Sequence, residues 1–505
     1  MSRATTPSFI TELPLKVSSQ QNRELEARFN AAMRLYNACL NEAKVRMELV
    51  KNSSAYQQAK SLPLFVTRNN KQLANPERKQ LFNEARKQYR FSDFGLQAFA
   101  TLTANRAKWI AEKIDSNTQQ KLATRAFNAV EKVLFNKAKK VRFKITTRFR
   151  SIEGKSNKQG LRWKSSLVVW GKLKLLPIIP KNNPVIEHGL NSKVKYVRLV
   201  WRELNGKKRW FVQLICEGQP YEKPQNYVSS GTIGLDLNIS NVAIVADDYA
   251  GLLPLADKVP TYQKEIRQLQ RKMERSRRAN NPDKYESNFQ KRVGRKIVTK
   301  KGQLKKGQQT KWCHSKHYYK TAIKKRELER KKAAYTKSQN RRLVNDILRH
   351  GSTIKTENVS VKAWQKIWGK AISNKSPGFF ISELHRKAEN AGGQFIKFST
   401  QKTALSQTHL TGNRVKKTLS QRVHTDETGV VMHRDLFSAF LARHINEDEL
   451  SLHDALQEYQ RLEPVLQEAW EHYQINCKQV SLSESRSAHS PSEQFSCYLK
   501  KLSTR

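Results

Sequence analysis

Acidic residues are scarce in this chain. It has 43 Asp and Glu against 95 Lys and Arg among its 505 residues, which gives a formal net charge of +52. A charge of this size opposes a compact state unless a polyanion neutralises it. The basic excess runs through most of the sequence instead of one tail. We therefore expect an extended surface that binds nucleic acid by releasing counterions from phosphates.

Long apolar runs and paired cysteines are also lacking. The sequence has no apolar run of about 18 residues, no secretory signal and no lipidation motif, which argues against a membrane as the polyanionic partner. The five cysteines are scattered, at Cys39, Cys216, Cys313, Cys477 and Cys497. Their spacing gives neither a disulfide framework nor a cysteine zinc site, and it fits a reducing cytoplasm.

The N-terminal part predicts one strand followed by helices. "SFITELPLKV" reads as a strand, and the next segment has apolar residues at helical spacing. One stripe of this first helix consists of Leu25, Phe29, Met33, Tyr36, Leu40 and Ala43. Further helical patterns continue to Asn136, so we expect a helical lobe after the first strand.

A β-rich module follows, in which basic and aromatic residues interleave. Alternating residues and turns such as "NGKK" predict a small barrel. Basic and aromatic side chains together suit phosphate contacts and base stacking. The candidates here are Arg148, Arg150, Lys155, Lys158, Arg162, Trp163 and Lys164. The alternative is a solvated strand face with the aromatic side chains inside.

The second half combines apolar strands with a long basic segment. "GTIGLDLNISNVAIVADD", "STIKTENVSV" and "QFIKFST" predict strands. Between the first two lies a Lys- and Arg-rich stretch. Its first part predicts an amphipathic basic helix that carries Arg267, Arg271, Arg275 and Arg278, and its middle predicts a loop or hairpin. The C-terminal end predicts a helix and then a disordered Ser-rich tail.

Three carboxylates stand out because of the elements that carry them. Asp236 interrupts an apolar strand, Glu357 ends one, and Asp435 opens an apolar helix. A carboxylate near a core element is costly unless it is paired, protonated or bound to a cation. One acid each from strand, strand and helix is the layout of an RNase H-like nuclease with two divalent ions. Alternatively, Asp236 and Asp435 cap turns or pair with Arg and Lys.

At these residues the chain resembles TnpB, the transposon-encoded (OrfB-type) RNA-guided nuclease. "IGLDLNISNVAIVADD", "TIKTENVSVKAW" and "HRDLFSAFLARH" resemble the first, second and third RuvC motifs of that family, in order. "SPGFFISELHRKAENAGGQF" and "STQKTALSQT" match the spacing between the second and third motifs. The resemblance extends to about Ile445, and it is shared with the related compact type V CRISPR effectors.

The resemblance implies an α/β and α+β multidomain fold. A wedge β-barrel (1–18 and 139–228) would be interrupted by a helical recognition lobe (19–138). A RuvC, RNase H-like nuclease domain (229–445) would follow. It would contain a basic helical insertion (262–349) and a degenerate zinc-ribbon segment (400–430). Residues 446–505 would form the C-terminal helix and disordered tail.

The resemblance also implies partners and chemistry. Asp236, Glu357 and Asp435 would be the catalytic residues and would bind two Mg²⁺ ions, and Arg434 would contact nucleic acid. The partners would be a guide RNA, derived from a transposon or a CRISPR locus, and target double-stranded DNA cut beside a short flanking motif. Base pairing would read the sequence while the protein grips the backbone. We expect a monomer with one RNA in a prokaryotic cytoplasm, associated with the nucleoid.

Relatives of this kind carry a zinc ribbon between the second and third motifs, and this chain lacks its cysteines. His409 and Thr411, then Asp426 and Thr428, stand at the expected positions. Only His409 and Asp426 could ligate zinc there, and a structural site takes four N or S ligands, so we expect no zinc. A second cluster, "CHSKH", lacks a fourth ligand and suits a basic RNA-facing loop. His433 either tunes the metal site or faces solvent.

Other functions stay open on the sequence. The fold could serve a guide-dependent DNA-binding repressor that does not cut, although acids at all three positions count against this. The protein could be a structural RNA-binding protein without chemistry, which the ordered acids oppose. A transposase that acts alone on element ends is a further possibility.

Overall fold

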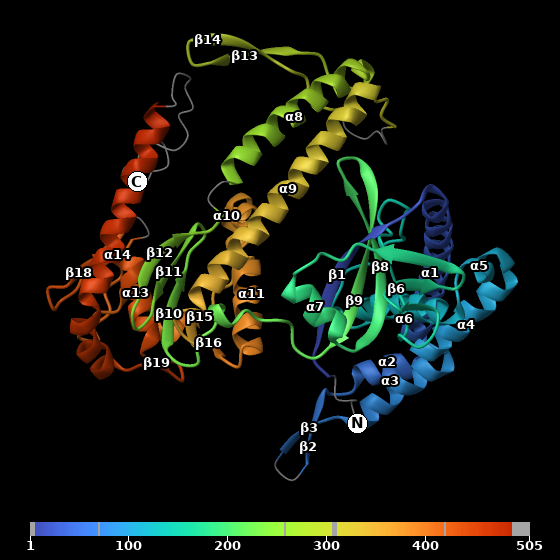
Figure 1. The fold of residues 1–505 in the computed structure, drawn as a ribbon, viewed down its shortest axis with the longest axis horizontal. Coiled ribbons are helices and arrows are strands. Elements are labelled where there is room, and N and C mark those ends of the chain that lie inside the picture. Colours follow the sequence, from blue (N-terminus) through green and yellow to red (C-terminus); the bar gives the residue numbers. More distant parts are fainter. Residues whose placement is uncertain (1–5, 69–70, 257–258, 306–310, 419–420, 487–505) are drawn as a thin grey trace. The chain divides into compact units, whose positions relative to one another are not determined.

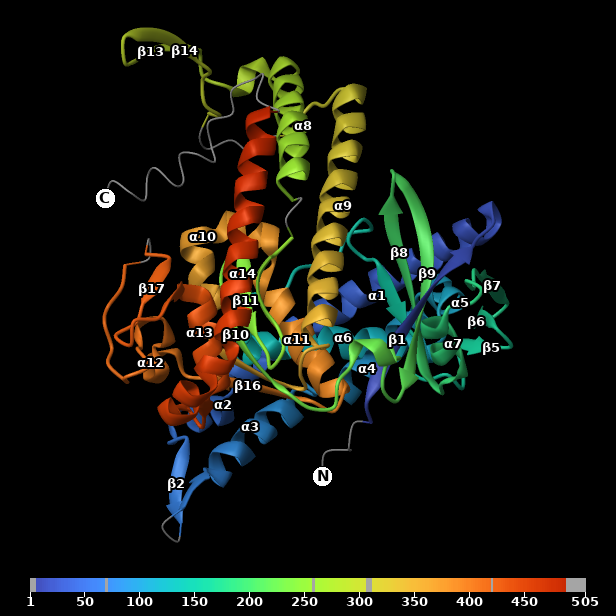
Figure 2. The ribbon, with the colours of Figure 1, turned by 60° about the vertical axis from the view of Figure 1, so that its left-hand side comes forward.

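The computed structural model describes residues 6–68, 71–256, 259–305, 311–418 and 421–486. The chain is a mixed α/β protein of two compact units, Met1–Tyr221 and Glu222–Arg505, whose elements are labelled in Figures 1 and 2. Within the described residues, every helix is too short or too polar to cross a membrane.

The first unit contains a seven-stranded antiparallel sheet of order β4-β8-β9-β1-β7-β6-β5. Its strands are β1 (Ser8–Lys16), β4 (Ser151–Glu153), β5 (Leu161–Lys164), β6 (Leu167–Trp170), β7 (Leu173–Pro177), β8 (Val194–Leu204) and β9 (Lys207–Glu217). The first strand of the chain pairs with both β7 and β9. No ladder joins β4 to β5 in the described part. These strands have three and four residues, and the sheet stays open there instead of closing into the expected barrel.

Helices occupy the interval between β1 and β4, together with a short hairpin that the sequence did not predict. The elements are α1 (Ser19–Asn52), α2 (Ser54–Ser61), β2 (Phe65–Arg68), β3 (Lys71–Ala74), α3 (Pro76–Gln88), α4 (Asp93–Arg106), α5 (Lys108–Lys113) and α6 (Ser116–Leu134); α7 (Pro184–Asn191) precedes β8. Ser18 and Gln21 form a capping box that starts α1. The predicted apolar stripe of α1 is confirmed, since all six of its residues are at most 7% exposed.

The second unit is built on a five-stranded sheet of order β12-β11-β10-β15-β16. The strands are β10 (Thr232–Leu237), β11 (Asn241–Val245), β12 (Ala250–Pro254), β15 (Thr353–Glu357) and β16 (Gln394–Phe398). β10, β15 and β16 run parallel, whereas β11 and β12 are antiparallel. The pairing of β10 with β15 places the strands that carry Asp236 and Glu357 side by side.

Helices cover both faces of this sheet. α13 (Arg434–Arg443) and α14 (Leu452–Arg486) share an apolar layer with one face. α9 (Lys316–Ile347) and α11 (Pro377–Asn390) pack on the other, as the two views show. The remaining helices are α10 (Val361–Lys375) and α12 (Thr400–Thr403), with short 3-10 turns at Pro224–Asn226, Pro282–Lys284 and Leu405–Gln407.

A long arm and two small hairpins complete this unit. α8 (Val259–Ala279) runs beside α9. The hairpin of β13 (Phe289–Val293) and β14 (Lys296–Lys300) follows α8 in the sequence and projects beyond the ends of the two helices, as Figures 1 and 2 show. β17 (Val423–Thr425) pairs with β18 (Val431–His433), and β19 (Ile445–Asn446) with β20 (Glu449–Leu450). Helix α14 enters the segment expected to be a disordered tail, and the rest of that tail lies outside the described residues.

Candidate active site

The alternation of side chains along β10 decides which face carries the first acid. The apolar layer against α9 and α11 contains Ile233, Leu235 and Leu237. Successive strand residues point to opposite faces. Gly234 and Asp236 therefore face α13 and α14.

β15 brings the second acid to the same face. Lys355 donates from Nζ to the main-chain oxygen of Arg443 in α13, at 2.9 Å. Glu357 is two residues further along β15, so its side chain points to the same face of the sheet. The parallel register sets Leu235 beside Thr356, and an acid follows directly in each strand. The two carboxylates thus come from the ends of neighbouring parallel strands.

A glycine lets α13 approach the sheet closely enough to add the third acid. A Cβ at Gly234 would lie 1.9 Å from the main-chain oxygen of Ala439. Only a residue without a side chain fits against a helix backbone at this distance. Asp435 is one turn before Ala439 on α13, and Asp236 is two residues after Gly234 on β10. This contact therefore brings the start of α13 to the two strand acids.

The electrostatics agree that the three acids are neighbours. Burial raises the pKa of Asp236 well above its usual range, and the carboxylates of Asp435 and Glu357 raise it further, against the opposing effect of two arginines. Burial alone raises the pKa of Glu357 to about 7. Crowded carboxylates disfavour one another's charge. A bound cation would remove that repulsion, and carboxylate oxygens are ligands that Mg²⁺ accepts, so the residues present fit a divalent ion.

Asp435 is held by arginines and by a histidine cap. It is 3% exposed, with Arg422 Nη1 at 3.7 Å and Arg434 Nε at 3.6 Å from its carboxylate oxygens. Its main-chain N–H donates to His433 Nδ1 at 3.2 Å, which caps α13. Burial lowers the pKa of His433, which suits a neutral ring that accepts this bond. His433 is 6% exposed, so of the two alternatives for this residue, the one in which it faces solvent is wrong.

The basic residues predicted to contact nucleic acid differ in exposure. In the first unit, the exposed ones are Arg148, Arg150, Lys155, Lys158 and Lys164, while Arg162 and Trp163 are half-buried. The exposed lysines and arginines lie on β5 and on the loops before it. Arg150 also stacks over Trp201, 5.2 Å from the ring centre.

In the second unit, three of the five predicted residues are on the surface. These are Arg267, Arg271 and Arg275 of α8. Arg278 instead stacks over Tyr285 at 4.1 Å and donates to Glu274 and to the Gly302 main chain. Arg434 is buried beside Asp435. These two arginines are therefore engaged inside the unit.

The segment at the zinc-ribbon position brings together three possible ligands. Donor atoms of His409, His424 and Asp426 all lie within 4.8 Å of one another, and all three residues are buried. Among the described residues this is the one such group of three or more. His409 and Asp426 were predicted from the sequence as possible ligands, whereas His424 was not. The signal was its two-residue spacing from Asp426, which places both side chains on one face of a strand.

The "CHSKH" cluster forms no comparable group among the described residues. Cys313 is exposed. His314 stacks flat on Tyr318 at 3.8 Å between ring centres. His317 is in the first turn of α9, which Ser315 caps, and its main-chain oxygen accepts from the Thr321 hydroxyl. The segment thus forms the entrance to a helix.

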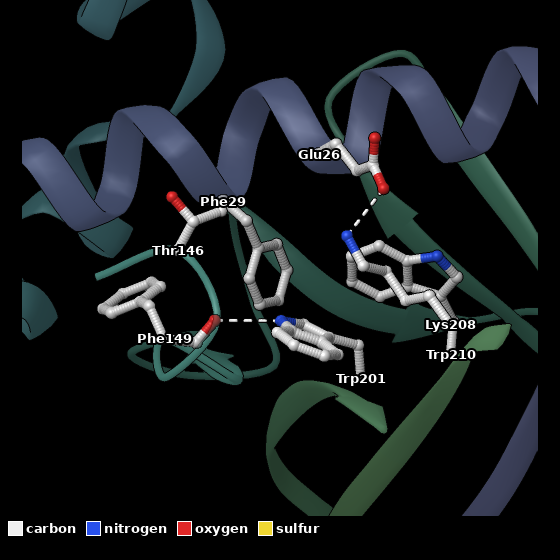
Figure 3. A pocket seen from close by; sticks show the side chains of 7 residues that line it. All are labelled: Glu26, Phe29, Thr146, Phe149, Trp201, Lys208 and Trp210. Atoms are coloured by element: carbon white, nitrogen blue, oxygen red, sulfur yellow. Dashed lines mark hydrogen bonds and ion pairs between the residues drawn. The ribbon is translucent and has the colours of Figure 1, made fainter. Parts of the chain in front are cut away.

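An aromatic cavity of about 150 Å³ lies in the first unit, between α1 and strands β8 and β9 (Figure 3). Its lining includes Phe29, Phe149, Trp201 and Trp210. The indole N–H of Trp201 donates to the Phe149 main chain, and that of Trp210 to Asn22. Lys208 pairs with Glu26 at 2.6 Å. These polar groups already have partners within the unit.

Comparisons with known proteins give matches only among solved structures. No protein-family model matches this sequence, and no curated protein does. A cryo-EM structure of a Cas12f1–sgRNA–target DNA complex matches with a TM-score of 0.41 and 12% identity, over 88% of this chain and 100% of that chain. A cryo-EM structure of a CRISPR-Cas12f ternary complex matches with a TM-score of 0.27 and 10% identity, over the same shares. At such scores we base the function on the residues of this chain.

Proposed function

We propose that this chain is an RNA-guided DNA endonuclease of the TnpB kind. It binds a guide RNA, recognises a short motif beside the target in duplex DNA, and hydrolyses DNA phosphodiester bonds after guide pairing. The observation that supports this most is the common face shared by Asp236, Glu357 and Asp435, one each from β10, β15 and α13. The net charge of +52 supports the nucleic-acid partners, because an RNA–DNA heteroduplex is gripped by its backbone.

The three acids would act as ligands for Mg²⁺. Two such ions, when bound, supply an activated water and stabilise the leaving oxygen. Carboxylate oxygens on one face of the sheet are the ligands that Mg²⁺ prefers.

Arg422 and Arg434 complete the site on the protein side. Their guanidinium groups balance part of the negative charge around Asp435 and help to orient that carboxylate. The side chain of Arg422 is 55% exposed, and its remaining N–H groups would bind a DNA phosphate in the bidentate way that arginine favours. Arg434 is buried and would act on the carboxylate alone.

The test is cleavage by the protein purified with its co-expressed RNA. That RNA is sequenced, and a plasmid with a matching target is incubated with Mg²⁺. Asp236→Asn keeps the side-chain shape and removes the charge, and should lower cleavage by on the order of a thousandfold or more. Asp283→Asn, an exposed acid of the same unit, is the matched control and should cleave normally.

The other outcomes identify the rival functions. Guide-dependent DNA binding without any nick would indicate a repressor-like protein. Purification without a defined RNA would rule out guided activity and favour a structural RNA-binding protein or a transposase that acts alone. A CRISPR array next to the gene, in place of transposon ends, would indicate a type V effector.

A further inference from the structure

A closed hydrogen-bond network occupies the segment before α13. The Lys417 ammonium contacts Nδ1 of His424, and Nε2–H of His424 donates to Asp426 Oδ2 at 3.0 Å. The side chains of His424 and Asp426 are 0% exposed. We refer to Lys417, His424 and Asp426 as the Lys–His–Asp network. It joins a cation to an anion through one imidazole ring.

The pKa shifts of His424 and Asp426 agree with a neutral imidazole beside an ionised carboxylate. Burial lowers the pKa of His424, and the Lys417 charge adds to this effect, against the opposing effect of Asp426. Burial also works to raise the pKa of Asp426, but hydrogen bonds from His424 and Thr428 outweigh it and hold that pKa below its usual range. The ring is therefore neutral between an ammonium and a carboxylate. Its two nitrogens then accept from one and donate to the other.

Apart from His409 Nε2, the atoms that a metal would need are already used by hydrogen bonds. Asp426 Oδ2 also accepts from the Leu410 N–H at 3.0 Å, and Oδ1 accepts from the N–H and hydroxyl of Thr428 at 3.1 and 2.8 Å. His409 Nδ1 accepts from the Glu427 N–H at 3.1 Å. Three of these donors are main-chain groups that cannot turn away without refolding the loop.

The donor set therefore does not fit a structural zinc ion. Such an ion takes four N or S ligands, and this segment offers two imidazoles and one carboxylate. A fixed ammonium beside His424 adds a repulsive charge where a divalent cation would bind. Because Nδ1 of His409 accepts a hydrogen bond, the proton of that ring is on Nε2, which has no partner among the described residues.

The network is connected directly to the helix that carries Asp435. The His424 ring stacks on Phe437 of α13, with centres 4.0 Å apart and planes 18° apart. His424 lies opposite Met432 in the β17–β18 ladder, three residues before Asp435. The main-chain oxygen of Arg422, just before β17, accepts from the first N–H of α13 at 2.8 Å. Moving β17 would therefore move the start of α13.

We propose that the Lys–His–Asp network replaces a metal ion as the structural centre of this segment and sets the position of Asp435. Lys417, His424 and Asp426 are positioning residues, since none of them reaches the reacting atoms. The part of the proposal that concerns activity rests on the proposed nuclease function. The replacement of the metal stands without it.

Two experiments distinguish the network from a zinc site: a measurement of bound zinc and the substitution of Lys417. The full chain with its co-purified RNA is dialysed against excess Zn²⁺, then against buffer, and its zinc is measured by mass spectrometry. We expect less than roughly 0.1 ion per chain, because no ligand set is available. Lys417→Met removes the ammonium. Zinc uptake should stay below the same level in this variant, because the main-chain hydrogen bonds to Asp426 and His409 remain; a rise to one ion per chain would show that the histidines and Asp426 are a usable zinc site. Stoichiometric zinc in the wild type would overturn the proposal.

The positioning role is tested by the Mg²⁺ dependence of cleavage. Lys417→Met should misplace Asp435, and a poorly placed ligand weakens the metal site. This variant should therefore need about tenfold more Mg²⁺ than the wild type for half-maximal cleavage. Lys417→Arg retains a cation and should restore most of the affinity. Lys416→Met removes the same charge from an exposed neighbour and is the matched control. Equal behaviour of the two methionine variants would refute the role.

Hydrogen exchange keeps the proposal testable if the wild type does not cleave. The amides of residues 431–437 should exchange at least about tenfold faster in Lys417→Met than in Lys416→Met, since the support under α13 is lost. Absence of cleavage with this difference present would count against the nuclease function alone. Equal exchange rates in Lys417→Met and Lys416→Met would count against the network, provided that thermal unfolding of the first unit is unchanged in both variants.

Discussion

Replacing Gly234 with alanine would test how the three acids are brought together. The added Cβ would lie 1.9 Å from the main-chain oxygen of Ala439 and 2.8 Å from the main-chain nitrogen of Arg443. Both atoms belong to the backbone of α13, so no side-chain rotation relieves the overlap. Ordinary contact begins near 3.4 Å, and α13 must retreat from β10 by roughly 1.5 Å.

Gly234→Ala should lower the stability of the fold modestly and the cleavage rate strongly. Overpacking of this kind costs about 1–3 kcal/mol of the free energy of unfolding. Asp435 moves with α13, and a displacement of about 1 Å at a reacting centre can cost about a hundredfold in rate. Binding of the guide RNA should change little, because the exposed arginines of α8 do not depend on this contact.

The assay compares three properties in one preparation. Thermal unfolding, RNA affinity and Mg²⁺-dependent plasmid cleavage are measured for the wild type, Gly234→Ala and Gly369→Ala. Gly369 lies in α10, and a Cβ there meets nothing within 4 Å, so this control adds the same methyl group without overlap. We expect it to match the wild type in all three properties.

Two results would refute the reasoning. Cleavage by Gly234→Ala within about twofold of the wild type would mean that α13 is not seated on β10 at this glycine, or that its position does not matter for the reaction. A parallel loss of RNA binding and cleavage would mean that the substitution unfolds the chain, instead of displacing one catalytic side chain.

Three further predictions concern charge and burial. Burial lowers the pKa of His444 to about 4, against the effect of Glu458. The unfolded chain therefore takes up this proton first, and stability present above pH 6.5 is lost as the pH falls toward 4. The free energy of unfolding, measured with urea, should therefore fall between pH 7 and pH 4.5, and His444→Gln should make this fall smaller by up to about 3 kcal/mol. Burial raises the pKa of the Cys39 thiol to about 12, whereas Cys313 is exposed. Iodoacetamide at pH 8 should label Cys313 and spare Cys39 until the chain is unfolded, as site-resolved mass spectrometry would show. Changing Arg267, Arg271 and Arg275 to serine should weaken RNA binding and reduce the slope of log affinity against log salt by roughly 2–3. An unchanged slope would exclude α8 from the interface.

The elements that carry the three acids could be predicted from the sequence, whereas the close approach of these acids in space could not. Apolar flanks were enough to place Asp236 within a strand, Glu357 at the end of another, and Asp435 at the start of a helix. The parallel register of β10 and β15 was not readable, because it joins residues about 120 positions apart. The role of Gly234 was hidden for the same reason, since its contact, Ala439, belongs to a distant helix.

The zinc-ribbon segment shows a different limit. His409 and Asp426 occupy expected cysteine positions and were predicted, whereas the role of His424 depends on its neighbours in space and was not. Lys417 looked like one more basic residue in a chain that has 95 of them. The open edge of the first unit's sheet was equally unreadable, because alternation indicates strands but not whether the last strand pairs with the first.

The pairing of β10 with β15 has a consequence for how the protein is made. The whole arm of α8, β13, β14 and α9 lies between these two strands in the chain, and α13 comes later still. Contacts between such distant segments form late, because a long loop must close first. A chain emerging from the ribosome completes the first unit and its basic surface well before the three carboxylates can meet. If the chain binds RNA as proposed, synthesis alone gives the nascent chain time to engage it before the acid cluster exists.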